Sequence, residues 1–427
     1  MLTRDSKDQR LKIEGVRLAT LARRYGTPLY IYSYSALVEN FTRVQKAFET
    51  VGATIAYSMK ANSSAAILRA LIRQGAGLDI VSGGELARAL RAKVDPGKVI
   101  FAGVGKTREE IEQALGAGIR AFNVESESEA AAIDDVARRL RKRAPINIRV
   151  NPDVEAGAHE YITTGRKENK FGIAYDSVNG LLKRLSKRRN LELIGLHAHI
   201  GSQITEIEPF VRSVRRVAEL VGELRAASHA IEFLNLGGGF GIAYEESEHA
   251  IDVEGLAAAL IPLIQPLGVE VFFEPGRYIV GPAGFLLTRV EYIKTAETKN
   301  FAIVDGAMND LLRPALYAAY HRIVPEGPPR RGRPRTYDVV GPVCESGDFL
   351  AKDRSFAGLS EGDLLLVRDA GAYGMVMASN YNSRPRPAEV LIRGNRHYLT
   401  RPRETIEEVI GQETVPDFLA NSTGGCD

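Results

Sequence analysis

The sequence predicts an α/β protein in which a (β/α)8 barrel is joined to a mostly antiparallel β domain. From about residue 35 to residue 284, short apolar runs alternate with segments that have the spacing of amphipathic helices. Eight such strand-plus-helix units in roughly 250 residues match the size of this kind of barrel. After Gly284 the sequence is rich in β-type runs, with few helical stretches between them. The alternation alone leaves a doubly wound open sheet as the alternative.

The eight predicted barrel strands are short apolar runs, and helical patterns such as Ser64–Gln74, Gly84–Ala92 and Arg108–Leu115 separate them. In a barrel the carboxyl ends of all strands form one face, where active sites lie. Polar motifs that follow different strands are therefore expected to meet at one mouth. The predicted strands are Thr54–Tyr57, Leu78–Val81, Val99–Ala102, Ala121–Val124, Ile146–Val150, Leu193–Ile200, Phe233–Leu236 and Val269–Phe273.

We expect residues 35–284 to form the barrel, and residues 1–34 together with 285–427 to form the β domain. The N-terminal run Leu29–Tyr32 is expected to add a strand to that domain. The other runs that predict its strands are Phe285–Tyr292, Phe301–Val304, Tyr337–Val340, Asp363–Val367 and Glu389–Ile392.

The composition is that of a soluble globular protein, with 44% hydrophobic and 26% charged residues. The formal net charge of +3 is too small to indicate a nucleic-acid or membrane-surface partner. There is no run of about 18 apolar residues that could span a membrane, and no apolar signal segment at the start. The two cysteines, Cys344 and Cys426, fit a reducing compartment. We therefore expect a cytoplasmic protein.

Lys60 is the most informative residue, because it directly follows the first predicted barrel strand in the run Tyr-Ser-Met-Lys-Ala-Asn. A lysine at the end of a buried strand is costly unless it is neutral, paired or covalently used. Burial is expected to lower its pKa and make the amine a nucleophile suited to Schiff-base chemistry. Most strand-end lysines instead extend to solvent, so this interpretation depends on the other motifs.

Two motifs after the seventh and eighth strands predict a phosphate site. Leu236–Gly241 contains three consecutive glycines, whose backbone N–H groups can approach a phosphate closely. Glu274–Arg277 follows the eighth strand with the sequence Glu-Pro-Gly-Arg. A tight turn would explain either glycine motif alone, but barrel enzymes often bind phosphate at these two loops.

His197 and His199 end the sixth strand, where alternation places them on the same face. No further ligands at suitable spacing are evident, so we predict no metal site. An imidazole can instead stack on an aromatic cofactor, and the nearby Ser202 could donate its hydroxyl to a phosphate.

In the second domain, Cys344 and Glu345 are adjacent in the polar run Gly341–Asp348. A buried free cysteine is the alternative, but the polar surroundings favour a reactive thiol. Arg313, Tyr317 and Tyr373 add polar groups to a domain that is otherwise poor in them.

Together these motifs resemble those of the diaminopimelate decarboxylases, pyridoxal-phosphate enzymes built from an alanine-racemase-like barrel and a β domain. The match runs in order from about Tyr57 to Arg386. The resemblance implies that pyridoxal 5'-phosphate is the cofactor and that meso-2,6-diaminopimelate is converted to L-lysine and CO2, the last step of lysine biosynthesis. It also implies a homodimer with shared active sites, in which the neighbour donates the Cys344 loop.

The resemblance further implies a role for each motif residue. Lys60 would hold the cofactor covalently, and Cys344 would be the acid that protonates the substrate at Cα. His199 would stack on the pyridine ring, and Glu274 would accept a hydrogen bond from the ring nitrogen. The remaining implied positions are Ser202, Gly239, Gly276, Arg277 and Tyr373 for the cofactor, Arg277, Arg313, Tyr317, Glu345 and Tyr373 for the amino-acid substrate, and Asp79 and Arg149 near the ring edge.

Three other functions stay open at this point. A relative that decarboxylates ornithine, arginine or carboxynorspermidine would share the fold and the cofactor, although Arg313 and Glu345 favour a substrate with a distal carboxylate. An alanine racemase would place an arginine against the ring nitrogen, where this chain has Glu274. A catalytically inactive binding protein would usually lack the lysine or the acid, and this chain has both.

Overall fold

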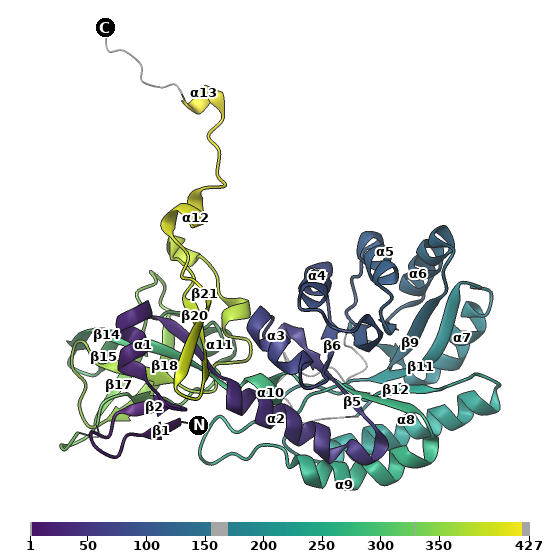
Figure 1. Ribbon diagram of the computed structural model, residues 1–427, viewed down its shortest axis with the longest axis horizontal. Coiled ribbons are helices and arrows are strands. Elements are labelled where there is room, and N and C mark those ends of the chain that lie inside the picture. The colour runs from purple at the N-terminus through teal and green to yellow at the C-terminus, as the bar shows by residue number, and fades with distance from the viewer. Residues whose placement is uncertain (1, 155–169, 329, 421–427) are drawn as a thin grey trace.

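The structure is a computed structural model that describes residues 2–154, 170–328 and 330–420 (Figure 1). Eight parallel strands form a closed barrel, since the strand that begins the circuit pairs again with the one that ends it. The predicted barrel is therefore confirmed, and an open doubly wound sheet is excluded. Each predicted strand overlaps an observed one. The barrel strands are β5 (Thr54–Ser58), β6 (Gly77–Ile80), β7 (Val99–Phe101), β8 (Ala121–Val124), β9 (Ala144–Asn151), β11 (Leu191–Ala198), β12 (Phe233–Asn235) and β13 (Glu270–Phe273).

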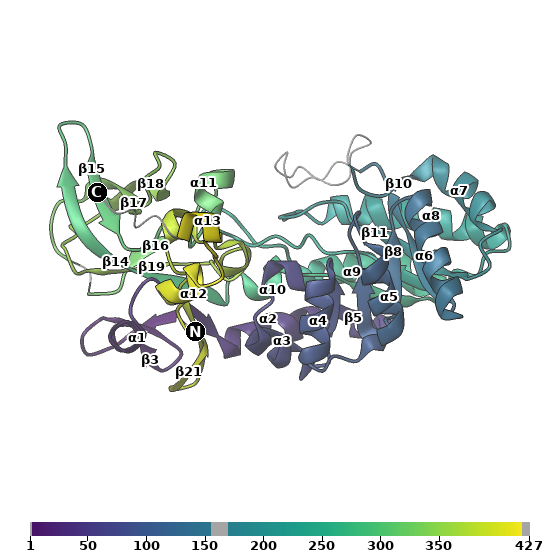
Figure 2. The same ribbon diagram turned by 90° about the horizontal axis from the view of Figure 1, so that it is seen from above.

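Helices cover the outside of the barrel, one after each strand (Figures 1 and 2). Four of the helices named below begin at serine or threonine N-caps, whose side chains accept hydrogen bonds from backbone N–H groups of the first turn. These caps let a helix start within a few residues of the preceding strand. The helices are α2 (Tyr34–Ala47), which precedes β5, and then α3 (Ala65–Ile72), α4 (Gly83–Arg91), α5 (Arg108–Ala117), α6 (Glu127–Leu140), α7 (Val178–Leu185), α8 (Glu208–Ala226), α9 (Val253–Ile264) and α10 (Arg277–Val280).

The barrel interior changes from apolar to polar toward the carboxyl ends of the strands. One buried layer is apolar and consists of Ala56, Ile100, Ala121, Phe233 and Phe272. Two residues further along four of these strands are the buried polar residues Ser58, Asn123, Asn235 and Glu274. Because every second residue of a strand faces the same side, both layers point inward. The polar layer forms the floor of the barrel mouth.

The β domain is built on a second, mostly antiparallel sheet, as predicted. The N-terminal strand β4 (Leu29–Ser33) lies in it between β14 and β20, which confirms the strand expected from Leu29–Tyr32. Two pairings, β15 with β17 and β4 with β20, are parallel. The strands are β14 (Gly284–Thr295), β15 (Asn300–Val304), β16 (Ile323–Pro325), β17 (Arg335–Val340), β18 (Phe349–Phe356), β19 (Leu364–Val367), β20 (Ala388–Arg393) and β21 (Arg396–Arg401).

Several short elements were not predicted. A small sheet of β1 (Leu2–Arg4), β2 (Leu11–Ile13) and β3 (Val16–Arg17) precedes α1 (Leu18–Tyr25). In the C-terminal half, α11 is Arg313–Tyr317, and α12 (Ile406–Ile410) and α13 (Asp417–Ala420) project from the β domain in Figure 1. No helix in the described ranges is long and apolar enough to cross a membrane.

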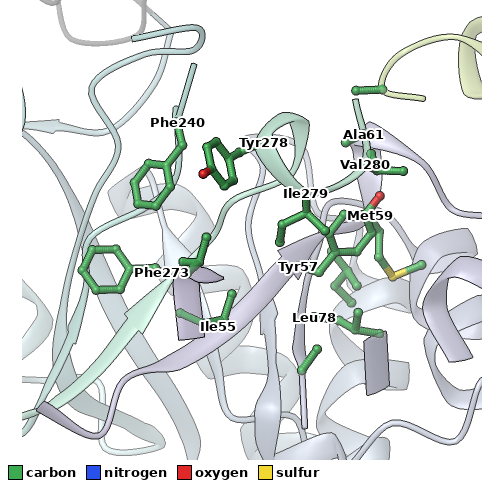
Figure 3. Close-up of a cluster of buried hydrophobic side chains, with 14 of the residues drawn as sticks. Ile55, Tyr57, Met59, Ala61, Leu78, Phe240, Phe273, Tyr278, Ile279 and Val280 are labelled. Carbon is green, nitrogen blue, oxygen red and sulfur yellow. The ribbon is translucent and has the colours of Figure 1, made fainter. Parts of the chain in front are cut away.

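The short helix α10 connects the barrel to the β domain, and all four of its residues are buried. Figure 3 shows Ile279 and Val280 of this helix beside Tyr57 and Met59, which belong to β5 and the 3-10 turn after it. Tyr278 packs edge-to-face on Phe240, with ring centroids 6.3 Å apart. This apolar packing holds the loop after β13 against the end of β5, so two segments that carry predicted site residues share one core.

Candidate active site

Lys60 lies at the mouth of the barrel, in the 3-10 turn Met59–Ala61 directly after β5. Its Nζ donates to Oδ2 of Asp79 at 2.8 Å and to Oγ of Ser58 at 3.3 Å. The side chain of Asp79 is fully buried, whereas that of Lys60 is 41% exposed. The amine is therefore held by a buried carboxylate from the neighbouring strand and remains open toward the mouth.

The expectation that burial lowers the pKa of Lys60 is wrong. Burial does oppose the charge on the amine, but Asp79, with further contributions from Tyr373 and Glu274, outweighs it and raises the pKa. The prediction considered burial alone. The opposing carboxylate comes from β6, and its position depends on how the barrel pairs its strands.

Glu274 is a buried carboxylate at the end of β13. Asn235 donates to its Oε1 at 2.5 Å, and Nε2 of His197 lies 3.2 Å from its Oε2. Burial would raise the pKa of Glu274, but His197, Lys60 and the hydrogen bond from Asn235 prevail and lower it to about 2. The group is therefore a carboxylate at neutral pH. The sequence reasoning missed Asn235, although a lone asparagine at an inward strand position is a usable signal.

His199 follows β11 and connects two loops of the mouth. Its Nδ1 accepts a hydrogen bond from the N–H of Gly238 at 3.2 Å. Burial, together with the charges of Arg149 and Lys60, holds the pKa of His199 well below its usual value, so the ring is neutral. Arg149 is itself paired with Glu125 at 2.8 Å, and both side chains are buried.

The glycines of the mouth allow three loops to pack backbone against backbone. A Cβ on Gly238 would lie 2.1 Å from the carbonyl oxygen of Glu274, and one on Gly239 would lie 2.4 Å from that of Gly201. Gly239 also has a φ of 98°, which L side chains rarely adopt. A Cβ on Gly276 would meet that of Ala61 at 2.9 Å. Any side chain at these positions would push the loops apart.

Arg277 begins α10, and its guanidinium group connects several mouth residues. It donates to Oγ of Ser202 at 3.2 Å and to the hydroxyl of Tyr244 at 2.7 Å. The same group lies 4.9 Å from the ring centroid of Tyr373. The N–H of Tyr373 in turn donates to the carbonyl of Ala61 at 2.8 Å, which ties this loop of the β domain to the turn that carries Lys60.

Arg313 brings a second buried guanidinium group from the β domain to the same place. It lies 4.6 Å from the ring centroid of Tyr244 and donates to Nε2 of His321 at 2.7 Å. Burial opposes the charge of Arg277, but the nearby tyrosines Tyr244, Tyr373 and Tyr317, the last at the end of α11, raise its pKa. Tyr244 and His321 were missed by sequence reasoning, although each lies within four residues of a motif that was recognised.

Cys344 and Glu345 lie apart from these residues, on an exposed loop between β17 and β18. The N–H of Cys344 donates to Asn382 at 2.8 Å, and Tyr381 donates its hydroxyl to Glu345 at 2.9 Å. Within the described ranges, no hydrogen bond or ion pair joins this loop to the turn at Lys60. One copy of the chain therefore brings together the other predicted site residues but not these two. Cys426 lies outside the described residues.

The comparisons with known proteins agree with this geometry. Residues 34–281 match the model of the pyridoxal-binding domain of pyridoxal-dependent decarboxylases. The diaminopimelate decarboxylase of Neisseria meningitidis serogroup A is 50% identical over 94% of this chain and 98% of its own length. The Pseudomonas aeruginosa enzyme of the same name is 48% identical over 96% of this chain and 98% of its own. The chain belongs to the diaminopimelate decarboxylase family.

Solved structures of this family share the whole fold. The diaminopimelate decarboxylase of M. jannaschii, solved with L-lysine, superimposes with a TM-score of 0.92 at 38% identity and covers 98% of this chain and 99% of its own. The Helicobacter pylori enzyme, also complexed with L-lysine, gives a TM-score of 0.88 at 39% identity over 92% of this chain and 98% of its own.

Proposed function

We propose that this chain decarboxylates meso-2,6-diaminopimelate to L-lysine and CO2 with pyridoxal phosphate as its cofactor. The observation that carries the proposal is the grouping at one barrel mouth of an amine, a buried carboxylate and two buried arginines (Lys60, Glu274, Arg277 and Arg313). The family relationship supports the same reaction.

We also propose that the enzyme acts in the cytoplasm, since two cysteines in 427 residues fit a reducing compartment.

The residues of the mouth fit this cofactor. Nε of Arg277 and Oδ1 of Asp79 are buried polar atoms with no hydrogen-bond partner among the described residues. The guanidinium group of Arg277, the hydroxyl of Ser202 and the N–H groups of the glycine loops form a donor set suited to a phosphate. The amine of Lys60 suits an aldehyde, and the carboxylate of Glu274 suits a protonated ring nitrogen.

We assign the cofactor contacts on this basis. When bound, pyridoxal phosphate supplies an electron sink for the electron pair that departing CO2 leaves behind. Lys60 would hold the cofactor through Nζ, and His199 would contact its ring. The negative charge of Glu274 would keep the ring nitrogen protonated. Ser202 and Tyr373, with the amides near Gly239 and Gly276, would hold the phosphate.

The substrate contacts follow from charge. Arg277 and Arg313 would bind a carboxylate, for which guanidinium groups are suited. Tyr317 and Glu345 would contact the distal end of the substrate, where Glu345 can pair with an ammonium group. Cys344 would deliver a proton from Sγ to the substrate's Cα. Because Cys344 and Glu345 lie apart from the mouth in one copy, we propose a homodimer in which a second copy supplies both.

A substrate panel tests the function. We expect purified protein with added pyridoxal phosphate to release CO2 from meso-diaminopimelate and to act poorly on ornithine, arginine and carboxynorspermidine. Lys60→Ala is expected to reduce release to background, because the amine that holds the cofactor is lost. The matched control Lys187→Ala, an exposed lysine after α7, should retain full activity. Preference for ornithine, or CO2 release by the Lys60 variant, would contradict the proposal.

A further inference from the structure

We infer that Tyr244 and His321 are positioning residues that hold Arg277 and Arg313 together as one binding site for the carboxylate that the product retains. This inference rests on the proposed function, because L-lysine keeps the distal carboxylate and amine of diaminopimelate. It adds two residues that do not contact the atoms that react. Their role is to fix the relative position of the two arginines.

The barrel contributes one half of this arrangement. Tyr244 is buried in the connection between β12 and α9, and its hydroxyl accepts the hydrogen bond from Nη1 of Arg277 at 2.7 Å. The backbone N–H of Tyr244 donates to Oε2 of Glu248 at 2.9 Å, which fixes the loop around it. The phenol oxygen is thereby held where it can orient Arg277.

The β domain contributes the other half. Arg313 lies over the face of the same Tyr244 ring, with 4.6 Å between its Cζ and the ring centroid. Its Nη1 donates to Nε2 of the fully buried His321 at 2.7 Å, and Nδ1 of His321 lies 2.9 Å from the carbonyl oxygen of Arg368. Since Nε2 accepts, Nδ1 must carry the ring proton and donate to Arg368. His321 is therefore neutral, in agreement with burial and Arg313 lowering its pKa to about 3.

Together these contacts allow two like charges to be buried side by side. Burial lowers the pKa of Arg313, and the positive charge of Arg277 acts in the same direction. Tyr244 opposes this repulsion twice, because its oxygen accepts from one guanidinium group and its ring face attracts the other. His321 supplies a neutral acceptor, so Arg313 is oriented without adding a counter-charge that would compete with an anionic ligand. The pair keeps its positive charge for a carboxylate.

Two substitutions remove these contacts with little change in volume. Tyr244→Phe deletes only the oxygen and keeps the ring under Arg313. His321→Met removes the acceptor, whereas His321→Gln keeps an acceptor at a similar distance from the backbone. Tyr292→Phe, at a tyrosine that is 64% exposed on β14, is the matched control. Thermal melting of each variant shows whether it is folded.

Calorimetry on cofactor-loaded protein then compares two ligands, L-lysine and cadaverine, which is the same diamine without a carboxylate. We expect Tyr244→Phe and His321→Met to weaken L-lysine binding by about tenfold, since a hydrogen bond to a charged group is lost from the pair. Cadaverine affinity should change by less than about twofold, because it has no carboxylate for the pair to bind. His321→Gln and Tyr292→Phe should bind L-lysine like the wild type. In turnover, the loss should raise KM for diaminopimelate more than it lowers kcat.

Equal losses for both ligands would show a merely structural role and overturn the inference, as would unchanged L-lysine binding in Tyr244→Phe. If His321→Met fails to fold, Tyr244→Phe decides the matter alone. Failure of the proposed function has a different signature, because the wild type would then neither release CO2 from diaminopimelate nor bind L-lysine.

Discussion

Asp79 and Glu274 are two buried carboxylates at one barrel mouth, and their pKa values are shifted in opposite directions. Burial and the charge of Glu274 raise the pKa of Asp79, although Lys60 opposes them. For Glu274, the surrounding His197, Lys60 and Asn235 outweigh burial and lower its pKa to about 2. The surroundings of these two chemically similar groups thus move their pKa values apart. Glu274 stays charged at neutral pH, while Asp79 depends on the amine it faces.

Replacing Asp79 by asparagine should therefore change how Lys60 titrates. The substitution removes the main group that raises the pKa of Lys60 and leaves burial, which lowers it. The fraction of neutral amine at pH 7 should rise, so cofactor-free protein should take up pyridoxal phosphate faster at that pH. The measurement is the rate of appearance of the bound cofactor's visible absorbance between about pH 6 and pH 10, a range that lies below the reference lysine pKa of about 10.4. An uptake profile shifted to higher pH would contradict this account of Lys60.

The position of Lys60 could be predicted from the sequence, but the direction of its pKa shift could not. Its place after an apolar strand could be predicted because strand and turn are local. The direction of its pKa shift could not, because Asp79 is brought beside it only by the pairing of β5 with β6. The same holds for Tyr244 and His321, which come together across the barrel and the β domain.

The glycine loop after β12 is the element that shapes the mouth. Gly239→Ala would force a Cβ to within 2.4 Å of the Gly201 carbonyl at a positive φ. We expect it to destabilise the protein by about 1–3 kcal/mol and to weaken pyridoxal phosphate binding, because the loops after β11 and β12 must separate. Thermal melting and cofactor titration measure the two effects.

Gly222→Ala is the control for this loop, because a Cβ there meets nothing within 4 Å and the residue lies on the exposed face of α8. It should stabilise the protein by about 0.5–1 kcal/mol and leave cofactor binding unchanged. Equal behaviour of the two variants would show that the close packing at Gly239 is not required.

Among the secondary-structure elements, the sequence predicts strands best where apolar runs are regular. All eight barrel strands could be predicted, since each is a compact apolar run followed by a helical pattern. The strands β1 to β3 could not, because two or three residues are too few to show alternation. Asn123 and Asn235 were overlooked in apolar strands, although their inward position is what gives the mouth its polar floor.

In one copy of the molecule, the proposed acid Cys344 lies apart from the proposed cofactor lysine, Lys60. Arg313 and Tyr373 reach the barrel mouth from the β domain of the same copy, through contacts with Tyr244 and Ala61. Cys344 and Glu345 lie on an exposed loop of that domain instead. Motif order along the chain cannot distinguish these two cases, because both sets of residues lie in the β domain. The central claim is therefore that barrel and Cys344 loop come from different copies.

Subunit complementation tests this claim most directly. Lys60→Ala should be inactive, and Cys344→Ala should be slowed by about 10²–10⁴-fold through loss of an acid. When the two are refolded together, random pairing makes about half of the dimers mixed, each with one intact site, so activity should recover to about a quarter of wild type. A mixture no more active than the average of the two variants would contradict a site shared between copies.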